Sequence, residues 1–521
     1  MVAEGLLRDL DAIGCVVEEV PYERKGYWFD VKAQKEKLPE LAGAFDQHGY
    51  FVEEVVCVDW REELELLYHF NHWDDPRRFS VRTRVKATDP EVPSIWNIYP
   101  GAGWHEREIH EFFGVKFKGH PNLSYLFLHP DIDFYPLRKD FVPVTEEDKR
   151  VLLGRFPEGD EESFWLNMGP QHPSTHGVLR LLLKMKGEFI EDMEPVLGYM
   201  HRMQEKMAEE RSYSQYYPNT ARMDYVAPLA FSLCYVLALE RCCGIEVPER
   251  AQFIRLIAME LNRIASHLLW LGTYLLDLGA ATPYFFAFDD REQILDILEG
   301  LTGSRLTYCY YRIGGVYEDL NEGFLEAVDR FIQRMKRRLK DYDELVTGNA
   351  IFLGRTKGIG VIPKEVARRY GVTGPNLRAS GVAFDIRVCE PYDGYRFLKP
   401  KVALREEGDS FARYLVRLDE IRASLSLLEE AISKVPEGPY RVEKLPKRPP
   451  VGDVFFATEG ARGEVGVYIV SDGSDKPYRL KWRSPSFSNF VSFTEIGKGM
   501  LIADAVATLG SLDLVVPEMD R

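Results

Sequence analysis

The chain has 521 residues, with 82 acidic and 66 basic side chains and a formal net charge of −16. Apolar residues make up 45% and charged residues 28%, which is typical of globular proteins and excludes disordered, collagen-like and low-complexity chains. The acidic balance argues against partners such as nucleic acid or anionic lipid, because both are bound by clustered Lys and Arg.

Residues 1–143 are predicted to form a small α/β domain. Short β-branched and aromatic runs predict strands at 27–33, 53–60, 64–73 and 79–87. Helical patterns are present at 6–14, 35–50 and 104–114, the last ending at Gly114. The stretch 120–141 is rich in Pro and Asp and is predicted to be irregular. A dense charge run with Pro and Gly predicts a linker at 144–163.

Residues 164–521 are predicted to form a large, mainly helical domain with β elements, so the fold class is α+β. A Gly/Pro loop at 166–177 precedes a predicted hairpin at 178–198. Long helical patterns dominate 201–345 and recur at 408–434. The stretch 463–489 is predicted to form antiparallel strands with a turn at Asp472-Gly473.

One apolar stretch is long enough to cross a bilayer. Between Arg263 and Asp289 the only formally charged residue is Asp277. An acid at mid-membrane costs roughly 2.5–3.5 kcal/mol, and Gly279 and Pro283 indicate that a helix ends there. We therefore expect a buried helix of a large domain. The N-terminus lacks the pattern of an export signal, which favours the cytoplasm.

The cysteines exclude several metal sites. There are seven, and no two have C-x-x-C spacing. Zinc ribbons, iron–sulfur clusters and thioredoxin-like sites all need such pairs. We therefore expect no metal to be bound by this chain.

Two histidines stand in the Gly/Pro loop, in His172-Pro-Ser-Thr-His176-Gly. Because prolines and glycines prevent a regular helix there, a loop with two imidazoles suits contact with a ligand and delivery of a proton. The alternative is that both histidines only bond backbone groups.

A stripe of polar and aromatic residues lies along an otherwise apolar helix near 250–277. Its members are three or four residues apart and fall on one face: Glu260, Arg263, His267, Trp270, Tyr274 and Asp277. Buried ionisable groups are either paired or functional. Pairing is the simpler reading for Glu260 and Arg263, at i and i+3, whereas His267 and Asp277 have no obvious local partner.

A third candidate precedes an apolar helix, at Arg222-Met-Asp224-Tyr225. A Tyr at a helix start can pack its ring and present its hydroxyl as a hydrogen-bond donor to a carbonyl. The alternative is a buried Tyr bonded to the backbone.

Several long segments resemble the D subunit of proton-pumping NADH-quinone oxidoreductase, respiratory complex I. They include GPQHPSTHGVLR (169–180), RMDY (222–225) and the run 260–288, and the resemblance covers essentially all of 164–521. The N-terminal part resembles the C subunit through 106–114, 119–123 and PLRKDF (136–141). The resemblance therefore implies a C subunit-like domain at 1–143 fused to a D subunit-like domain at 164–521.

The D subunit family shares its fold with the large subunit of nickel-iron hydrogenases, so this fold is expected here. Those enzymes hold their metals through two C-x-x-C pairs, and neither is present in this chain. The resemblance thus implies a quinone-headgroup cavity in place of the metal site.

The resemblance also implies roles for individual residues. His176 and Tyr225 would hydrogen-bond the two quinone carbonyls, with His172 in the same loop and Asp277 supporting protonated His176. Arg222 and His267 would lie beside the terminal iron–sulfur cluster of a neighbouring subunit. One departure is Met203, where the family pattern His-Arg-Gly leads us to expect glycine.

As partners, the resemblance implies a cluster-bearing B-like subunit, an I-like subunit and a membrane H-like subunit. FMN and the iron–sulfur clusters would belong to partner subunits, quinone would be the substrate, and the chain would lie peripherally on the cytoplasmic side of the cell membrane. Two alternatives stay open. One is a related oxidoreductase that uses F420, ferredoxin or polysulfide, and the other is a noncatalytic scaffold.

Overall fold

The structure is a computed structural model that describes residues 2–129, 132–142, 164–171 and 177–521. Its N-terminal part contains a five-stranded sheet in the order β1-β2-β5-β4-β3, in which only β2 and β5 run parallel. The strands are β1 (Val16–Glu19), β2 (Phe29–Lys32), β3 (Phe51–Asp59), β4 (Glu63–Asn71) and β5 (Phe79–Lys86). The main predicted strands are confirmed, whereas the short and polar β1 was not predicted.

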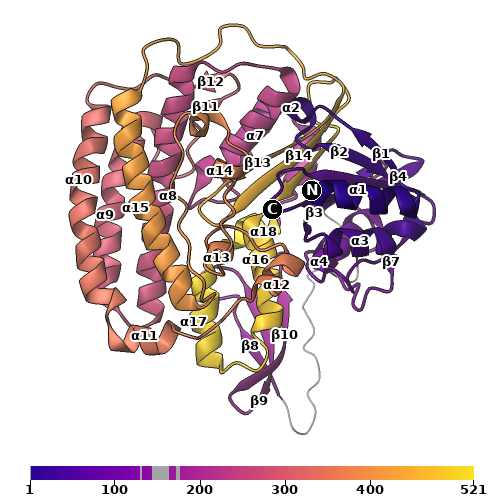
Figure 1. Cartoon of the computed structure of the whole chain (residues 1–521), viewed down its shortest axis with the longest axis horizontal. Helices are drawn as coiled ribbons and strands as arrows, with labels where there is room; N and C mark the ends of the chain where they lie inside the picture. Colours follow the sequence, from indigo (N-terminus) through magenta and orange to yellow (C-terminus); the bar gives the residue numbers. More distant parts are fainter. Residues whose placement is uncertain (1, 130–131, 143–163, 172–176) are drawn as a thin grey trace.

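Helices α1 (Val2–Ile13), α3 (Leu38–Gln47) and α4 (Ala102–Phe113) accompany this sheet (Figure 1). The predicted end of α4 at Gly114 is confirmed, because this residue has φ 78° and its amide N–H donates to His110. A Cβ at Gly114 would lie 2.6 Å from the Tyr135 ring, so only glycine fits both the turn and the ring. Short strands β6 (Glu91–Pro93) and β7 (Lys116–Lys118) were not predicted.

The larger part begins with the predicted hairpin. Strands β9 (Arg180–Lys186) and β10 (Phe189–Val196) pair antiparallel, and β8 (Phe164–Met168) adds a third strand. Helices then follow: α5 (Gln204–Glu210), α6 (Tyr213–Thr220), α7 (Pro228–Cys243), α8 (Glu249–Asp277), α9 (Ala281–Thr302) and α10 (Phe324–Tyr342). The two-stranded ribbon of β11 (Tyr311–Arg312) and β12 (Gly315–Val316) lies within 201–345, where the sequence predicted mainly helices.

Helix α8 packs against α9 and α15 (Ser410–Lys434), in the helical layer on the left of Figure 1. Most of its side chains from Ala251 to Leu275 are buried, so the prediction of a buried helix is confirmed. The helix ends at Asp277, and α9 begins after three residues. Among the residues that the structure describes, we find no helix with the length and apolar character to span a membrane.

The C-terminal region differs in part from its prediction. Strands β13 (Gly452–Glu459), β14 (Glu464–Ser471) and β15 (Arg479–Arg483) form an antiparallel sheet. However, residues 484–489 open helix α16 (Pro485–Ile496), because the Ser484 hydroxyl caps it by accepting the Phe487 N–H. Asp472-Gly473 lies inside a longer loop between β14 and β15 rather than forming a two-residue turn.

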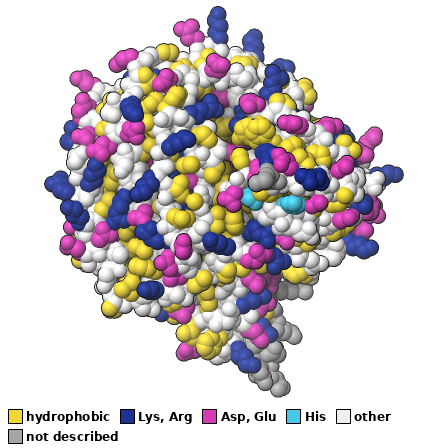
Figure 2. Space-filling view, in the orientation of Figure 1, with side chains coloured by type: hydrophobic (Ala, Val, Ile, Leu, Met, Phe, Trp, Pro, Cys, Tyr) yellow, Lys and Arg dark blue, Asp and Glu magenta, His cyan; other side chains and the backbone are white. Residues whose placement is uncertain are grey.

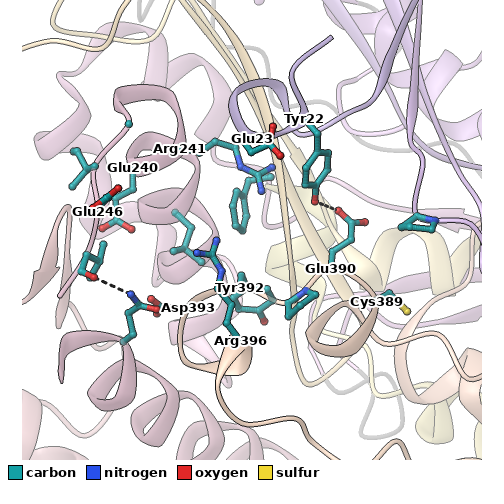
Figure 3. Close-up of a pocket in the computed structure, with 18 of the residues that line it drawn as sticks. Tyr22, Glu23, Glu240, Arg241, Glu246, Cys389, Glu390, Tyr392, Asp393 and Arg396 are labelled. Atoms are coloured by element: carbon teal, nitrogen blue, oxygen red, sulfur yellow. Dashed lines mark hydrogen bonds between the residues drawn. The ribbon is translucent and has the colours of Figure 1, made fainter. Parts of the chain in front are cut away.

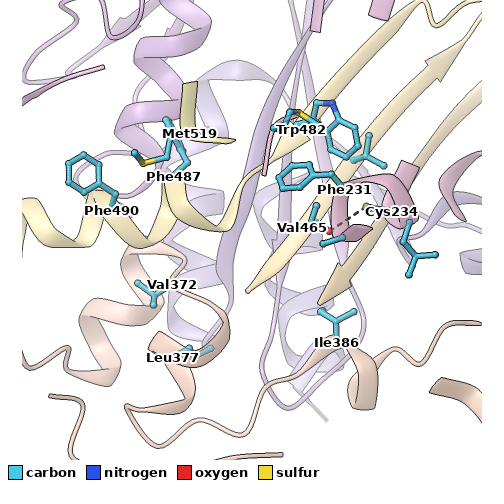
Figure 4. Packing of buried hydrophobic residues seen from close by; sticks show 14 of the residues in the cluster. Phe231, Cys234, Val372, Leu377, Ile386, Val465, Trp482, Phe487, Phe490 and Met519 are labelled. Atoms are coloured by element: carbon cyan, nitrogen blue, oxygen red, sulfur yellow. Dashed lines mark hydrogen bonds between the residues drawn. The ribbon is translucent and has the colours of Figure 1, made fainter. Parts of the chain in front are cut away.

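Two further helices complete the chain, α17 (Ile502–Leu512) and α18 (Val516–Asp520), and the C-terminus lies near the centre of the molecule (Figure 1). Buried apolar residues from α7, β14, β15 and α16 pack closely in this central region (Figure 4). The core is continuous from the N-terminal sheet into the larger part. Arg483 of β15, for example, donates at 3.0 Å to the backbone oxygen of Glu53 in β3.

Charged side chains of both signs are interspersed over the face that Figure 2 shows. The predicted linker at 144–163 falls outside the described residues, so the domain boundaries remain a prediction.

Candidate functional site

The loop between α6 and α7 carries the predicted residues Arg222 and Tyr225 together with Asp224. The carboxylate of Asp224 is buried and accepts the backbone N–H groups of Val226 and Ala227 at 3.1 and 3.0 Å. Its other oxygen lies 2.7 Å from the Arg462 guanidinium. Asp224 thus fixes both the start of α7 and the position of a buried arginine.

Tyr225 is placed by this loop at the surface. Its side chain is 39% exposed, so the alternative of a buried Tyr bonded to the backbone is wrong. Burial opposes ionisation of Arg462, but Asp224, Asp513, Glu518 and Tyr225 outweigh it and hold its pKa above the usual value. The partly exposed Tyr225 therefore interacts electrostatically with a fixed positive charge, which favours an acceptor with partial negative charge at this place.

The C-terminal segment reaches the same arginine. Asp513 lies 3.5 Å from Arg462, and Glu518 accepts the Ser486 N–H at 2.9 Å. Burial and the nearby Asp224 raise the pKa of Glu518 to about 8. A carboxyl group that stays protonated near neutral pH can release a proton locally.

The predicted histidines His172 and His176 lie outside the described residues. Gly177, which follows His176, has φ 146°, and a Cβ there would stand 3.4 Å from Val516 of α18. The described end of this loop therefore lies against the same C-terminal segment that contacts Arg462.

Asp277 ends α8 beside α17. A Cβ built on Gly510 would lie 3.7 Å from the Asp277 carboxylate and only 2.9 Å from the Tyr274 ring. The indole N–H of Trp270 donates to the Gly510 carbonyl at 2.8 Å. The absence of a side chain at Gly510 is what lets α17 approach this end of α8.

The other end of the predicted stripe is fully buried. Glu260 and Arg263 are 3.5 Å apart, as the simple pairing alternative predicted. His267 contacts Glu420 of α15 at 2.9 Å, and burial lowers the pKa of His267 despite this carboxylate. Ten residues of helix separate His267 from Asp277, which is about 15 Å at 1.5 Å per residue.

Arg222 and His267 are therefore placed differently. Arg222 is exposed, and its guanidinium donates to the Pro218 carbonyl. His267 is 0% exposed within this chain. Arg222 is the one of this pair that a neighbouring subunit can reach directly.

The sequence did not predict the buried ionic network around His267. Arg378 donates to Glu420 at 2.6 Å and to Glu459 at 2.8 Å, and Arg387 lies 3.1 Å from Glu260. These residues are spread over α8, α13 (Gly374–Arg378), α14 (Ile386–Cys389), α15 and β13. Of these residues, Glu260 stands in the run 260–288 that carries the resemblance.

A family model described as "Respiratory-chain NADH dehydrogenase, 49 Kd subunit" matches residues 277–450 and 445–521, and the corresponding 30 Kd subunit model matches residues 31–147. A C/D subunit of NADH-quinone oxidoreductase from Phocaeicola vulgatus is 40% identical over 91% of this chain and 96% of its own length. The protein named C/D 2 from Aquifex aeolicus is 39% identical over 91% of both chains.

This chain belongs to the C/D subunit family of NADH-quinone oxidoreductase. The C/D chain is therefore a subunit of an oxidoreductase complex. Its D-like part is also similar to a separate D subunit of NADH-quinone oxidoreductase from Desulfotalea psychrophila, which is 54% identical over 69% of this chain and 98% of its own length.

Met203, which stands where the family pattern predicts glycine, has an unusual backbone conformation in the C/D chain. Met203 has φ 53°, in the left-handed region that favours glycine, and its sulfur lies 2.9 Å from the His201 ring. The backbone thus keeps the conformation that a glycine would adopt easily, although this chain carries a side chain there.

Within the described residues of the C/D chain, no group of three or more His, Cys, Asp or Glu side chains is arranged to hold a metal ion. A cavity of about 730 Å³ lies at the junction of the two parts of the chain. The predicted site residues that the structure describes are not among its lining residues.

Proposed function

We propose that this chain forms the quinone-headgroup site of a proton-translocating NADH-quinone oxidoreductase. The observation that carries the proposal is the position of the C-terminal segment 510–518. It contacts the end of α8 through Gly510, the Tyr225 loop through Asp513 and Arg462, and the end of the histidine loop through Val516. Three segments that are far apart in the sequence therefore share one neighbour, which supports their forming a common site.

In this proposal Tyr225 donates a hydrogen bond to one quinone carbonyl and His176 donates to the other. Reduction of quinone to quinol takes up two electrons and two protons, one at each carbonyl oxygen, so a donor at each end matches the chemistry. Asp277 favours the protonated form of His176 by its negative charge. The fixed charge of Arg462 stabilises electron density that develops on the carbonyl beside Tyr225.

The electrons would come from an iron–sulfur cluster of a B-like neighbouring subunit, with the exposed Arg222 on the side that faces it. An I-like subunit, a membrane H-like subunit and FMN in a further partner complete the proposed assembly. The chain would lie peripherally on the cytoplasmic side of the membrane. The proposal also includes a fold like that of the hydrogenase large subunit. It keeps the domain boundaries at 1–143 and 164–521, with a linker at 144–163.

The test is photolabelling of the native complex with a quinone that carries a photoreactive group on its ring. We expect the label on peptides that contain Tyr225, the histidine loop or residues 510–518, and we expect unlabelled quinone to prevent it. Labelling of this chain only elsewhere would contradict the proposal.

The electron donor is tested separately on the same complex. We expect quinone reduction with NADH. Reduction with reduced F420 or ferredoxin, and not with NADH, would instead favour the related oxidoreductases while leaving the quinone site in place.

A further inference from the structure

A cavity of about 730 Å³ lies far from the α8–α17 contact, where the N-terminal part of the chain meets the larger part. Tyr22 and Glu23 of α2 (Tyr22–Lys25) and Trp28 line one side. The opposite side comes from the end of α7, the start of α8 and the segment 389–396 (Figure 3). The cavity therefore exists only where the two parts of the chain are docked.

Acidic groups dominate the lining. Five carboxylates face two arginines, and the carboxylates belong to Glu23, Glu240, Glu246, Glu390 and Asp393. One arginine, Arg241, lies over the Tyr22 and Phe456 rings at 4.9 and 4.3 Å from their centroids. Its guanidinium group thus makes cation–π contacts with both rings.

Two of the five carboxylates are already used by the protein. Glu240 accepts from Arg255 at 2.6 Å and from the Gly314 N–H at 2.6 Å. Glu390 accepts from the Tyr22 hydroxyl at 2.5 Å and from Arg78 at 2.8 Å. Asp393 and the exposed Glu23 and Glu246 remain as possible contacts for a ligand.

Asp393 is the feature that indicates a ligand. Its side chain is only 5% exposed, and its Oδ2 atom is buried without a hydrogen-bond partner among the described residues. Its other oxygen lies 3.5 Å from Arg255. A buried acceptor of this kind costs free energy unless a donor reaches it.

A second acceptor, on Gln252 of α8, lines the same cavity as Asp393. Gly394 packs directly on α8, where a Cβ would stand 2.9 Å from the Gln252 carbonyl. The Gln252 amide nitrogen donates to Val247 at 2.8 Å, which fixes its side-chain oxygen as an acceptor, and that oxygen is also buried without a described partner. The Asp393 Oδ2 atom and the Gln252 side-chain oxygen therefore both require a hydrogen-bond donor.

We propose that this cavity binds an aliphatic organic cation with two or more ammonium groups, of the polyamine class. One ammonium group would donate to Asp393 and Gln252, and a second would lie at the mouth near Glu246 and Glu23. Ammonium groups carry donors and no acceptor, and their alkyl stem suits the apolar and aromatic walls. The proposal does not rest on the quinone site, because its readout is binding rather than turnover.

The binding should depend on pH through Asp393. Burial is the largest cause that raises the pKa of Asp393 to about 7, with Glu240 of α7 adding to it and Arg255 of α8 and Arg396 opposing it. Tyr311 of β11 is the further titratable group that faces Asp393. A cation prefers the ionised carboxylate, so we expect binding about tenfold tighter at pH 8 than at pH 6.

The experiment is calorimetric titration of the full-length chain with spermidine at low salt. We expect saturable binding that weakens as salt is added, and a higher melting temperature in its presence. Asp393→Asn should weaken binding by about tenfold or more. Asn tolerates the positive φ of 47° at this position, so the backbone is kept. Glu246→Gln should weaken binding two- to threefold, because it removes one solvent-exposed ionic contact.

The matched control is Asp296→Asn, which removes one acidic charge from the exposed face of α9. Spermidine affinity should not change in this variant. A neutral diol of similar length and the dianion glutarate should not bind. Absence of saturable binding, equal affinity in Asp393→Asn, or competition by glutarate would overturn the proposal. If circular dichroism shows that Asp393→Asn does not fold, unchanged affinity in Glu246→Gln would overturn it.

Discussion

Replacing Tyr225 by Phe removes one hydroxyl and keeps the ring. The side chain is 39% exposed, and no hydrogen bond of its hydroxyl is found among the described residues. Folding therefore does not depend on this group, and we expect the free energy of unfolding to change by less than about 0.5 kcal/mol. Any large effect of this substitution must then come from a ligand.

The expected effect on turnover is large. Tyr225 lies beside Arg462, whose position is fixed by Asp224 at 2.7 Å. A donor held in place for a carbonyl that gains electron density is typically worth 10²- to 10³-fold in rate, or about 2.7–4 kcal/mol. We therefore expect Tyr225→Phe to lower quinone reduction by about 10²-fold.

The assay is NADH-dependent quinone reduction by the purified complex. The same preparation is tested with a soluble artificial acceptor that takes electrons before the quinone site, and this rate should be unchanged. The matched control is Tyr317→Phe, because the Tyr317 side chain is also exposed, at 52%. Near-normal quinone reduction in Tyr225→Phe, with the complex intact, would refute the role given to the hydroxyl.

Three further predictions concern other parts of the chain. His176→Ala should strongly lower quinone reduction while the complex assembles normally, as judged by gel filtration, and normal turnover would reject its role. Gly510→Ala places a methyl group 2.9 Å from the Tyr274 ring on α8 and should lower the free energy of unfolding by about 1–3 kcal/mol, measured by urea denaturation. The control is Gly354→Ala, where a methyl group would have no atom within 4 Å, and it should not destabilise the chain. Burial opposes ionisation of Glu108, but Arg521 and Lys481 outweigh it and hold the Glu108 pKa at about 2, below an unfolded value of about 4.3. Ionised Glu108 therefore contributes to the free energy of unfolding above about pH 4.3, and this contribution is lost as pH falls towards 2. In Glu108→Gln the free energy of unfolding should fall less steeply over that pH window.

Local patterns in the sequence predicted those features that depend on residues close to one another along the chain, namely secondary structure and pairs on one helix face. Four of the five strands of the N-terminal sheet, the hairpin at 178–198 and the buried α8 all follow from hydrophobic periodicity. The Glu260–Arg263 pair was predictable for the same reason, because residues three apart on a helix lie side by side. The helix at 485–496 was missed because its aromatic and β-branched residues resemble a strand, and the Ser484 cap was not recognised.

The candidate site was predictable only in part. The motif containing Arg222 and Tyr225 drew attention to the loop between α6 and α7, but nothing local indicated that Arg462 would lie beside it. The partner of His267 is Glu420, which is 153 residues away in the sequence. Such contacts are set by how the helices pack, and a single sequence contains no periodic signal for them.

The junction between the two parts of the chain has a consequence for assembly. Arg78 of the N-terminal part pairs with Glu390 of the larger part at 2.8 Å, and Arg82 pairs with Asp453 at 2.8 Å. Between separate molecules, these contacts would have to overcome the loss of translational freedom. On one polypeptide the effective concentration of the two parts is on the order of millimolar. Fusion therefore fixes their ratio at one to one and makes docking independent of how much of the protein the cell produces.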